Sequence, residues 1–263
     1  MIVESITVFA SGFMPIFRRD YAPTKANNAE LFFKASSEFF GENMMSGSLE
    51  VGSSTLWFRK HGDKGLLVVT REGDASMLVN VLDRNLLFAL DRVLRDEKTL
   101  RRLIDRLVIA ALGIETYVKS FMPSLKAVAA VAYRNHKTKM LVGEDLGRLP
   151  YLPKDRKDVV VRFEDKHCVI AIPLSHGYLV IKCDQESLDV INEVVEVLRF
   201  DYPEVLLAGD DLALYKKLRE AYSIVYPDKP GLLLADVDSL LRRNLSVSEA
   251  VRTIAYAYGV EAP

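Results

Sequence analysis

Residues 158–184 alternate hydrophobic and polar side chains, and this pattern predicts three consecutive β-strands. Two-residue turns at Asp165-Lys166 and Ser175-His176 would bring the apolar faces of the strands into register. The predicted cross-strand rows are Phe163–Cys168–Cys183, Val161–Ile170–Ile181 and Val159–Ile172–Leu179. A slip of one residue would break every row, so the register is well specified. We therefore expect Phe163, Ile170 and Ile181 to be buried together.

The N-terminal pattern predicts a second sheet that begins with a hairpin. Residues 2–10 and 13–18 have strand-like alternation on either side of Ser11-Gly12. Pro15 indicates that the second of these strands lies at a sheet edge or pairs on one side only at this position, because proline cannot donate a ladder hydrogen bond. The remaining N-terminal predictions are a helix at 29–40 ended by Gly41, a connection at 44–54, and strands at 55–59, 65–70 and 76–82.

A long helical stretch follows Asp83, with apolar residues recurring at three- to four-residue steps. A polar interruption at 95–99 splits it into two helices, with Asp96 or Thr99 as the cap. The first 121 residues thus predict five antiparallel strands, one inserted helix and terminal helices.

Residues 126–200 predict the same order again, without the inserted helix. The predicted elements are strands at 127–133 and 138–142, a connection through Leu149, Pro150 and Pro153, the three strands described above, and a helix at 186–200. The last sixty residues are predicted to be helical apart from strand-like alternation at 204–207. Their predicted helices begin at Asp210 or Asp211, at Asp236, and at the capping box Ser246–Glu249.

The predicted fold class is therefore α+β. Two successive antiparallel-sheet units with flanking helices occupy residues 1–121 and 126–200, and a helical segment occupies 201–263. Each of the first two segments is expected to form its own sheet, covered by the helix or helices that follow it.

Composition excludes several classes of protein without selecting one. The net charge of −1 gives no electrostatic reason to expect nucleic acid or an anionic membrane as partner. No apolar run approaches the roughly 20 residues of a membrane span, and the N-terminus lacks the basic region of a signal peptide. We expect a cytoplasmic protein. Gln185 is the only glutamine beside 27% charged residues, which is typical of thermophilic proteins.

No catalytic or metal-binding constellation is visible in the sequence, and no cofactor is expected. The four histidines, His61, His136, His167 and His176, all fall in or beside predicted turns. Nucleotide-binding loops and hydrolase elbows do not occur. The acidic pair in Gly209-Asp210-Asp211 is better explained as a helix start than as a metal site.

Cys168 and Cys183 are the candidate site residues. Their apolar strand faces argue against a reactive thiolate. The alternatives are therefore two buried thiols or a cross-strand disulfide. Cytosolic disulfides are rare outside hyperthermophiles, and the scarcity of glutamine, a thermophile tendency, keeps the disulfide open. The register predicts that the two sulfurs are neighbours. A three-residue loop with Gly177 in a left-handed conformation would instead place Cys183 opposite Val169.

The opening phrase ITVFASGFMPIFRR, with Ser11, Gly12, Phe13, Met14 and Pro15, resembles the longin and roadblock families of small α+β domains. Members commonly begin with a strand, a glycine-centred hairpin, a helix and a three-strand meander. The resemblance covers residues 1–121 best and 126–200 more loosely, where the inserted helix is missing. PAS, GAF and profilin-like domains share much of this layout.

The resemblance implies a non-catalytic protein-interaction platform or regulator, serving a Ras-like small GTPase or a trafficking or motility assembly. Such domains dimerise through helices or sheet edges, so the expected partners are another protein or a second copy. The alternative is a small-molecule sensor of PAS- or GAF-like layout, with a ligand enclosed between sheet and helix. An enzyme ranks third, because no nucleophile, base and orienting group can be assembled.

Overall fold

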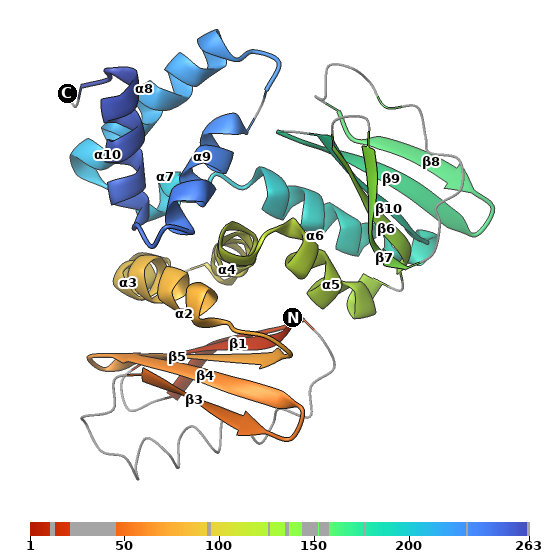
Figure 1. The fold of residues 1–263 in the computed structure, drawn as a ribbon, viewed down its shortest axis with the longest axis horizontal. Helices are drawn as coiled ribbons and strands as arrows, with labels where there is room; N and C mark the ends of the chain where they lie inside the picture. The colour runs from red at the N-terminus through yellow and green to blue at the C-terminus, as the bar shows by residue number, and fades with distance from the viewer. Residues whose placement is uncertain are drawn as a thin grey trace. The chain divides into compact units, whose positions relative to one another are not determined.

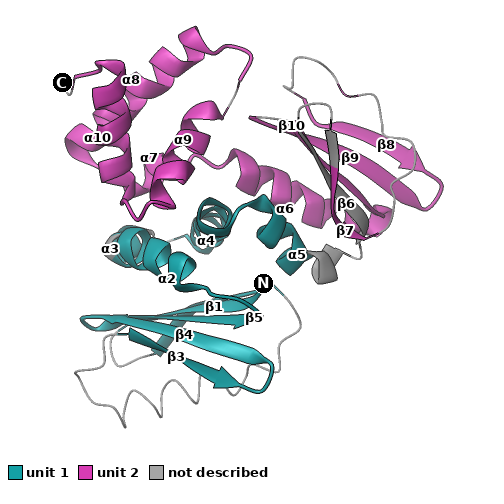
Figure 2. Ribbon diagram, in the orientation of Figure 1, with its two compact units in different colours: residues 1–121 teal, residues 122–263 magenta. Residues whose placement is uncertain are grey.

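The structure is a computed structural model that describes residues 1–10, 14–21, 46–93, 96–125, 127–134, 137–143, 152, 158–175, 177–229 and 231–261. The chain divides into two compact units, residues 1–121 and 122–263 (Figure 2). Each unit contains one five-stranded antiparallel sheet with helices, which confirms the α+β class. A separate third domain at 201–263 stays a prediction.

The sheet of the first unit has the strand order β2-β1-β5-β4-β3. Its strands are β1 (Ile2–Ala10), β2 (Met14–Asp20), β3 (Ser46–Val51), β4 (Ser54–His61) and β5 (Lys64–Arg71). Pro15 lies on β2, which is an edge strand, as predicted, and it faces Phe9 just past an irregularity between Val8 and Phe9. An edge strand pairs on one side only, which is the position in a sheet where proline is tolerated.

Two predictions for the first unit are wrong. The segment 44–54, predicted to be a connection, contains β3, whose residues are largely exposed, so no hydrophobic alternation marks it. Residues 76–82, predicted to be a strand, form helix α2 (Ser76–Leu82). Its buried residues Leu78, Val79, Val81 and Leu82 follow helical spacing, and the carboxylate of Asp74 accepts a hydrogen bond from the backbone N–H of Ser76.

The helices of the first unit lie over one face of its sheet (Figure 1). Helix α2 continues through a π-helical turn, η2 (Asp83–Leu87), into α3 (Phe88–Val93). Helix α4 (Glu97–Leu112) begins at Asp96, whose side chain accepts a hydrogen bond from the N–H of Lys98, so the predicted cap is confirmed. Gly113, with a φ of 82°, separates α4 from α5 (Ile114–Leu125).

The sheet of the second unit has the order β7-β6-β10-β9-β8, the same as that of the first, which confirms the predicted repeat. Its strands are β6 (Ala127–Arg134), β7 (Lys137–Gly143), β8 (Val160–Glu164), β9 (His167–Leu174) and β10 (Gly177–Asp184). A 3₁₀ turn, η3 (Gln185–Ser187), leads into helix α6 (Leu188–Arg199) beside the sheet (Figure 1). The predicted helix at 29–40 and the proline-bearing connection lie outside the described residues, Leu152 excepted.

The predicted register of β8, β9 and β10 is confirmed. Cys168 faces both Phe163 and Cys183, and Ile170 faces both Val161 and Ile181. The third predicted row is reduced to Ile172 and Leu179, because β8 begins at Val160. Leu174 faces Gly177, so the second turn has two residues and the three-residue alternative is excluded.

The burial expected for this meander is correct for two strands and wrong for the third. Ile170 and Ile181 are 1% and 0% exposed, whereas Phe163 is 62% exposed. The physical reason is that β8 is the last strand of the sheet, so the apolar row continues past the edge of the buried core. On the opposite face, Leu152 and Val160 pack against the cluster Val169, Ala171, Tyr178 and Val180.

The C-terminal helices are α7 (Tyr202–Leu206), α8 (Gly209–Val225), α9 (Leu232–Leu241) and α10 (Val247–Tyr258); α8, α9 and α10 pack against one another. Residues 204–207 are therefore not a strand. Asp210 and Asp211 lie in the first turn of α8 after the N-cap Ala208, and Asp236 lies inside α9, so these cap predictions are wrong. The capping box of Ser246 and Glu249 is confirmed.

Candidate functional site

The outer edge of β8 is the first candidate site. Glu164 faces His167 across a two-residue turn, and in such a hairpin this closing pair exchanges backbone hydrogen bonds. Hydrogen-bonded pairs recur at every second residue, so Val160, Arg162 and Glu164 bond inward to β9. Val161 and Phe163 consequently direct their backbone N–H and C=O groups outward, where no other strand pairs with them among the described residues.

The side chains of β8 divide into an apolar face and a charged face. Val161 and Phe163 are 42% and 62% exposed, and they extend the face that buries Ile170 and Cys168 on β9. Arg162 and Glu164 form an ion pair on the opposite face, where Lys182 Nζ also lies 3.4 Å from Glu164 Oε2. The hydrogen bond from Arg162 lowers the pKa of Glu164, so this carboxylate is charged at neutral pH.

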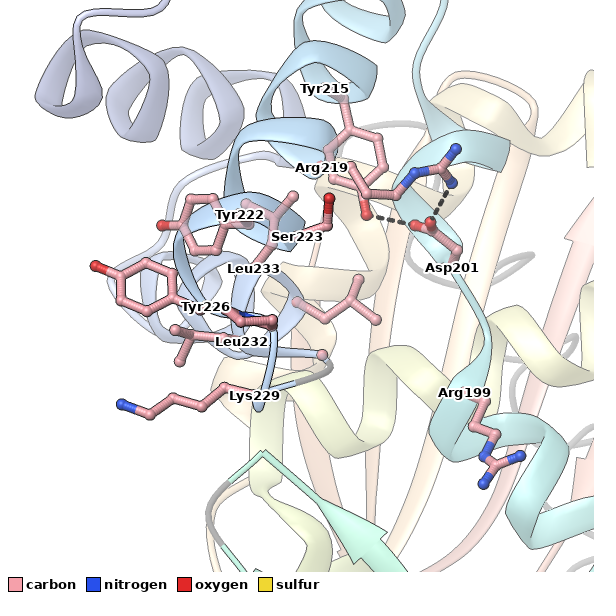
Figure 3. Close-up of a pocket in the computed structure, with 13 residues that line it drawn as sticks. Arg199, Asp201, Tyr215, Arg219, Tyr222, Ser223, Tyr226, Lys229, Leu232 and Leu233 are labelled. Atoms are coloured by element: carbon pink, nitrogen blue, oxygen red, sulfur yellow. Dashed lines mark hydrogen bonds and ion pairs between the residues drawn. The ribbon is translucent and has the colours of Figure 1, made fainter. Parts of the chain in front are cut away.

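The second candidate site is a hollow of about 280 Å³ within the C-terminal helices (Figure 3). Helix α8 supplies a wall of tyrosines, and the start of α9 supplies the apolar residues Leu232, Leu233 and Leu234. On the other side, Asp201 accepts hydrogen bonds from Tyr215 Oη at 2.5 Å and Arg219 Nη1 at 3.0 Å. This carboxylate is thus held by two donors, which leaves it poorly suited to act as a base.

The other polar groups of the hollow do not converge on one point. Figure 3 shows the hydroxyls of Tyr222 and Tyr226 pointing away from Asp201, and the charged ends of Lys229 and Arg199 lying on opposite sides. Burial and the neighbouring Asp201 raise the pKa of Tyr215, so its phenol stays protonated. The geometry therefore offers an aromatic and aliphatic surface for binding, and no arrangement for proton transfer.

The structure brings the candidate residues Cys168 and Cys183 together. Their Sγ atoms are 3.5 Å apart, both side chains are fully buried, and the two cysteines are not bonded. Burial, with the adjacent Cys168 thiol, raises the pKa of Cys183 to about 12. A thiol of this kind is protonated at neutral pH, which argues against a nucleophilic role.

Sequence reasoning missed a buried polar cluster in the first unit. Asp105 Oδ1 and Oδ2 accept hydrogen bonds from Arg19 Nε at 3.0 Å and Arg19 Nη2 at 2.8 Å, and Oδ1 accepts one from Tyr21 Oη at 2.6 Å. The Arg19 guanidinium also lies over the rings of Tyr21 and Phe121. The one available signal was the charged pair Asp105-Arg106 inside the otherwise apolar run from Leu103 to Ala111, which indicates buried partners.

The histidines do not assemble a metal site in the described part of the chain. His61 ends β4, and His167 Nε2 lies 3.3 Å from Asp184 Oδ1; His136 and His176 lie outside the described residues. Among the residues that the structure describes, no three His, Cys, Asp or Glu side chains are grouped so as to hold a metal ion.

Comparison of the chain with protein-family models gives no match, and comparison with curated proteins gives none either. In the described ranges, no helix has both the length and the apolarity needed to cross a membrane.

Proposed function

We propose that this chain is a non-catalytic protein-interaction platform, of the kind that regulates Ras-like small GTPases or joins trafficking or motility assemblies. The observation that carries the proposal is the edge strand β8, which directs backbone groups outward and exposes Val161 and Phe163 beside them. An apolar edge with open hydrogen-bonding groups is the geometry that accepts an added strand. The longin and roadblock resemblance supports the same class of function.

The occupant we propose for this edge is a second copy of the chain, paired antiparallel through β8. Two-fold pairing centred on Phe163 places Phe163 opposite the partner's Phe163, where the outward backbone groups can exchange hydrogen bonds. Arg162 then lies opposite the partner's Glu164, and Glu164 opposite the partner's Arg162. Pairing centred on Arg162 would instead oppose two arginines, which is destabilising. Charge complementarity therefore selects the register centred on Phe163.

A charge-swap series tests this pairing. Arg162→Glu and Glu164→Arg should each abolish the dimer, because each brings like charges together across the edge. The double variant Arg162→Glu/Glu164→Arg should restore the dimer, and an equimolar mixture of the two single variants should form a heterodimer. Sedimentation equilibrium measures the association, which we expect in the micromolar range because this register pairs only residues 162–164 of each strand and buries little surface.

The matched control is Met140→Lys on β7, the opposite edge of the same sheet, where Met140 is 39% exposed. This variant should associate as the wild type does, and far-UV circular dichroism should show that every variant is folded. A monomeric wild type at all concentrations would refute self-pairing. Identification of copurifying proteins by native mass spectrometry then tests the wider platform role, and finding neither a protein partner nor self-association would refute it.

The hollow at Tyr215, Tyr222 and Leu233 supports a second candidate function, a small-molecule sensor. Its aromatic and aliphatic lining suits a compact, largely apolar ligand, and its volume of about 280 Å³ is near the lower end for ligand pockets. Native mass spectrometry of the purified protein would show a bound metabolite, and Leu233→Trp, which fills the hollow, should eliminate it. Retention of the metabolite in that variant would place its site elsewhere.

A further inference from the structure

Cys168 and Cys183 are the only two cysteines of the chain, and they occupy facing positions on β9 and β10. Their sulfurs are 3.5 Å apart, and Cys168 Sγ lies 3.7 Å from the carbonyl oxygen of Cys183. A disulfide requires an S–S distance of about 2.0 Å. The question is whether the backbone permits this closure.

The hydrogen-bond pattern of β9 and β10 determines how far apart the Cα atoms of Cys168 and Cys183 lie. The backbone N–H of Gln185 donates to the carbonyl of Lys166 at 3.3 Å, and hydrogen-bonded pairs recur at every second residue. Cys168 and Cys183 are therefore also a hydrogen-bonded pair, for which Cα atoms lie about 5.5 Å apart. A disulfide spans Cα separations of about 4.4–6.8 Å. The Cα separation therefore permits the bond in this register, and a small backbone adjustment must bring the Cβ atoms to the roughly 3.5–4.5 Å that a disulfide requires.

The folded protein nevertheless hides these sulfurs from a dissolved oxidant. Both cysteines are 0% exposed, and the next residues on the same strand faces, Ile170 and Ile181, are also buried. The pKa of Cys183, raised by burial to about 12, keeps the reactive thiolate scarce. Oxidation of the native state therefore requires that β9 and β10 open first.

We propose that Cys168 and Cys183 form a folding-gated disulfide site, which closes when the chain folds in the presence of a small disulfide oxidant and is inert to that oxidant once folded. With oxidised glutathione, one protein thiolate attacks the glutathione disulfide, forms a mixed disulfide and releases one glutathione. The second protein thiolate attacks the protein sulfur of that mixed disulfide and releases the other glutathione. Two protein thiols are oxidised, and one glutathione disulfide is reduced to two thiols, which take up the two protons.

The test treats two states of the reduced protein, unfolded and already folded, with the same oxidant. Reduced, unfolded protein is refolded with oxidised glutathione, quenched, unfolded, alkylated and weighed. We expect loss of two hydrogen atoms, no alkyl group and no glutathione adduct. Reduced protein that is already folded should remain fully alkylatable in the same mixture, with an oxidation rate lower by on the order of 100-fold than that of the unfolded chain.

Two variants test the pairing of the cysteines and the gating by folding separately. Cys168→Ser leaves Cys183 alone and should give only a glutathione adduct on refolding. Ile170→Ala loosens the strands beside the thiols and should accelerate oxidation of the folded protein. Glutathione adducts in place of the internal bond in refolded wild type would overturn the site. Equal oxidation rates for folded and unfolded wild type, or a destabilised Ile170→Ala that oxidises no faster, would overturn the gating.

Discussion

Replacing Asp105 by asparagine tests the buried ion pair that joins edge strand β2 to helix α4. The side chains of Asp105 and Arg19 are 1% and 10% exposed, and the pair is bidentate. Burial raises the pKa of Asp105, while Arg19 and Tyr21 act in the opposite direction by stabilising the carboxylate. Burial alone would lower the pKa of Arg19, but Asp105 outweighs it and raises that pKa above its usual range.

The expected cost of Asp105→Asn follows from this geometry. Removing one member of a buried ion pair typically costs 3–5 kcal/mol, because the remaining charge is left without compensation. Asparagine keeps one oxygen that can accept from Arg19 or Tyr21, so we expect about 3 kcal/mol. The double variant Arg19→Met/Asp105→Leu removes both charges and should lie within about 1 kcal/mol of the wild type. The pair should therefore be strongly non-additive.

Guanidinium unfolding followed by circular dichroism measures these changes, as a shift of midpoint at constant slope. The control is Glu115→Gln, which removes the partly exposed i,i+4 pair between Glu115 and Lys119 and should change stability by less than about 0.5 kcal/mol. A loss below about 1 kcal/mol for Asp105→Asn, or a double variant less stable than Asp105→Asn, would contradict the expected effect of the buried pair. A small loss for Asp105→Asn would mean that water reaches the pair.

Two further predictions concern the second unit. Ile170→Ala should cost about 2–5 kcal/mol of unfolding free energy, because the Ile170 side chain is 1% exposed. Phe163→Ala on the exposed edge should cost less than about 1 kcal/mol in the monomer. Equal shifts of the unfolding midpoint for the two variants would contradict the edge assignment. Asp211 accepts hydrogen bonds from Arg252 Nε at 2.7 Å and Ser248 Oγ at 2.5 Å, and Arg252 is the main cause of its lowered pKa. The stabilisation that the Asp211 carboxylate contributes to the folded state should be fully present above its ordinary pKa of 3.8. It should disappear as the pH falls through the lower pKa that Asp211 has in the folded protein. The Tm difference between wild type and Asp211→Asn should accordingly shrink below that pH, and a difference that grows on acidification would contradict this sign.

Sequence reasoning predicted the elements whose signal is local. The register of β8 to β10 followed from alternation in three adjacent strands, and the helix start at Ser246 followed from a four-residue motif. It failed where the surroundings of a segment in the fold, and not its own residue pattern, decide whether the segment is a strand or a helix. Strand β3 has almost no buried side chain to mark it, and the run SMLVNVL at 76–82 was too short to separate strand from helix.

The candidate sites were accessible to sequence only in part. The facing cysteines could be predicted, because a short hairpin fixes their register. The partner of Asp105 could not, since Arg19 lies 86 residues away and one sequence offers no distance between them. The exposure of Phe163 was equally hidden, because alternation predicts which face a residue occupies and not how far the covering layer extends.

The repeated sheet order sets a limit on the proposed self-pairing. Strands β3 and β8 are the corresponding edges of the two sheets, and both expose apolar residues, with Leu49 at 38% and Val51 at 49% on β3. The two edges differ in charge, however. Strand β3 carries Glu50 as its single charged residue, so two copies paired there would gain no opposite charge. Alternating Arg162 and Glu164 make β8 complementary to itself. If charge complementarity selects the partner, dimerisation belongs to β8 alone, although both edges expose similar apolar side chains.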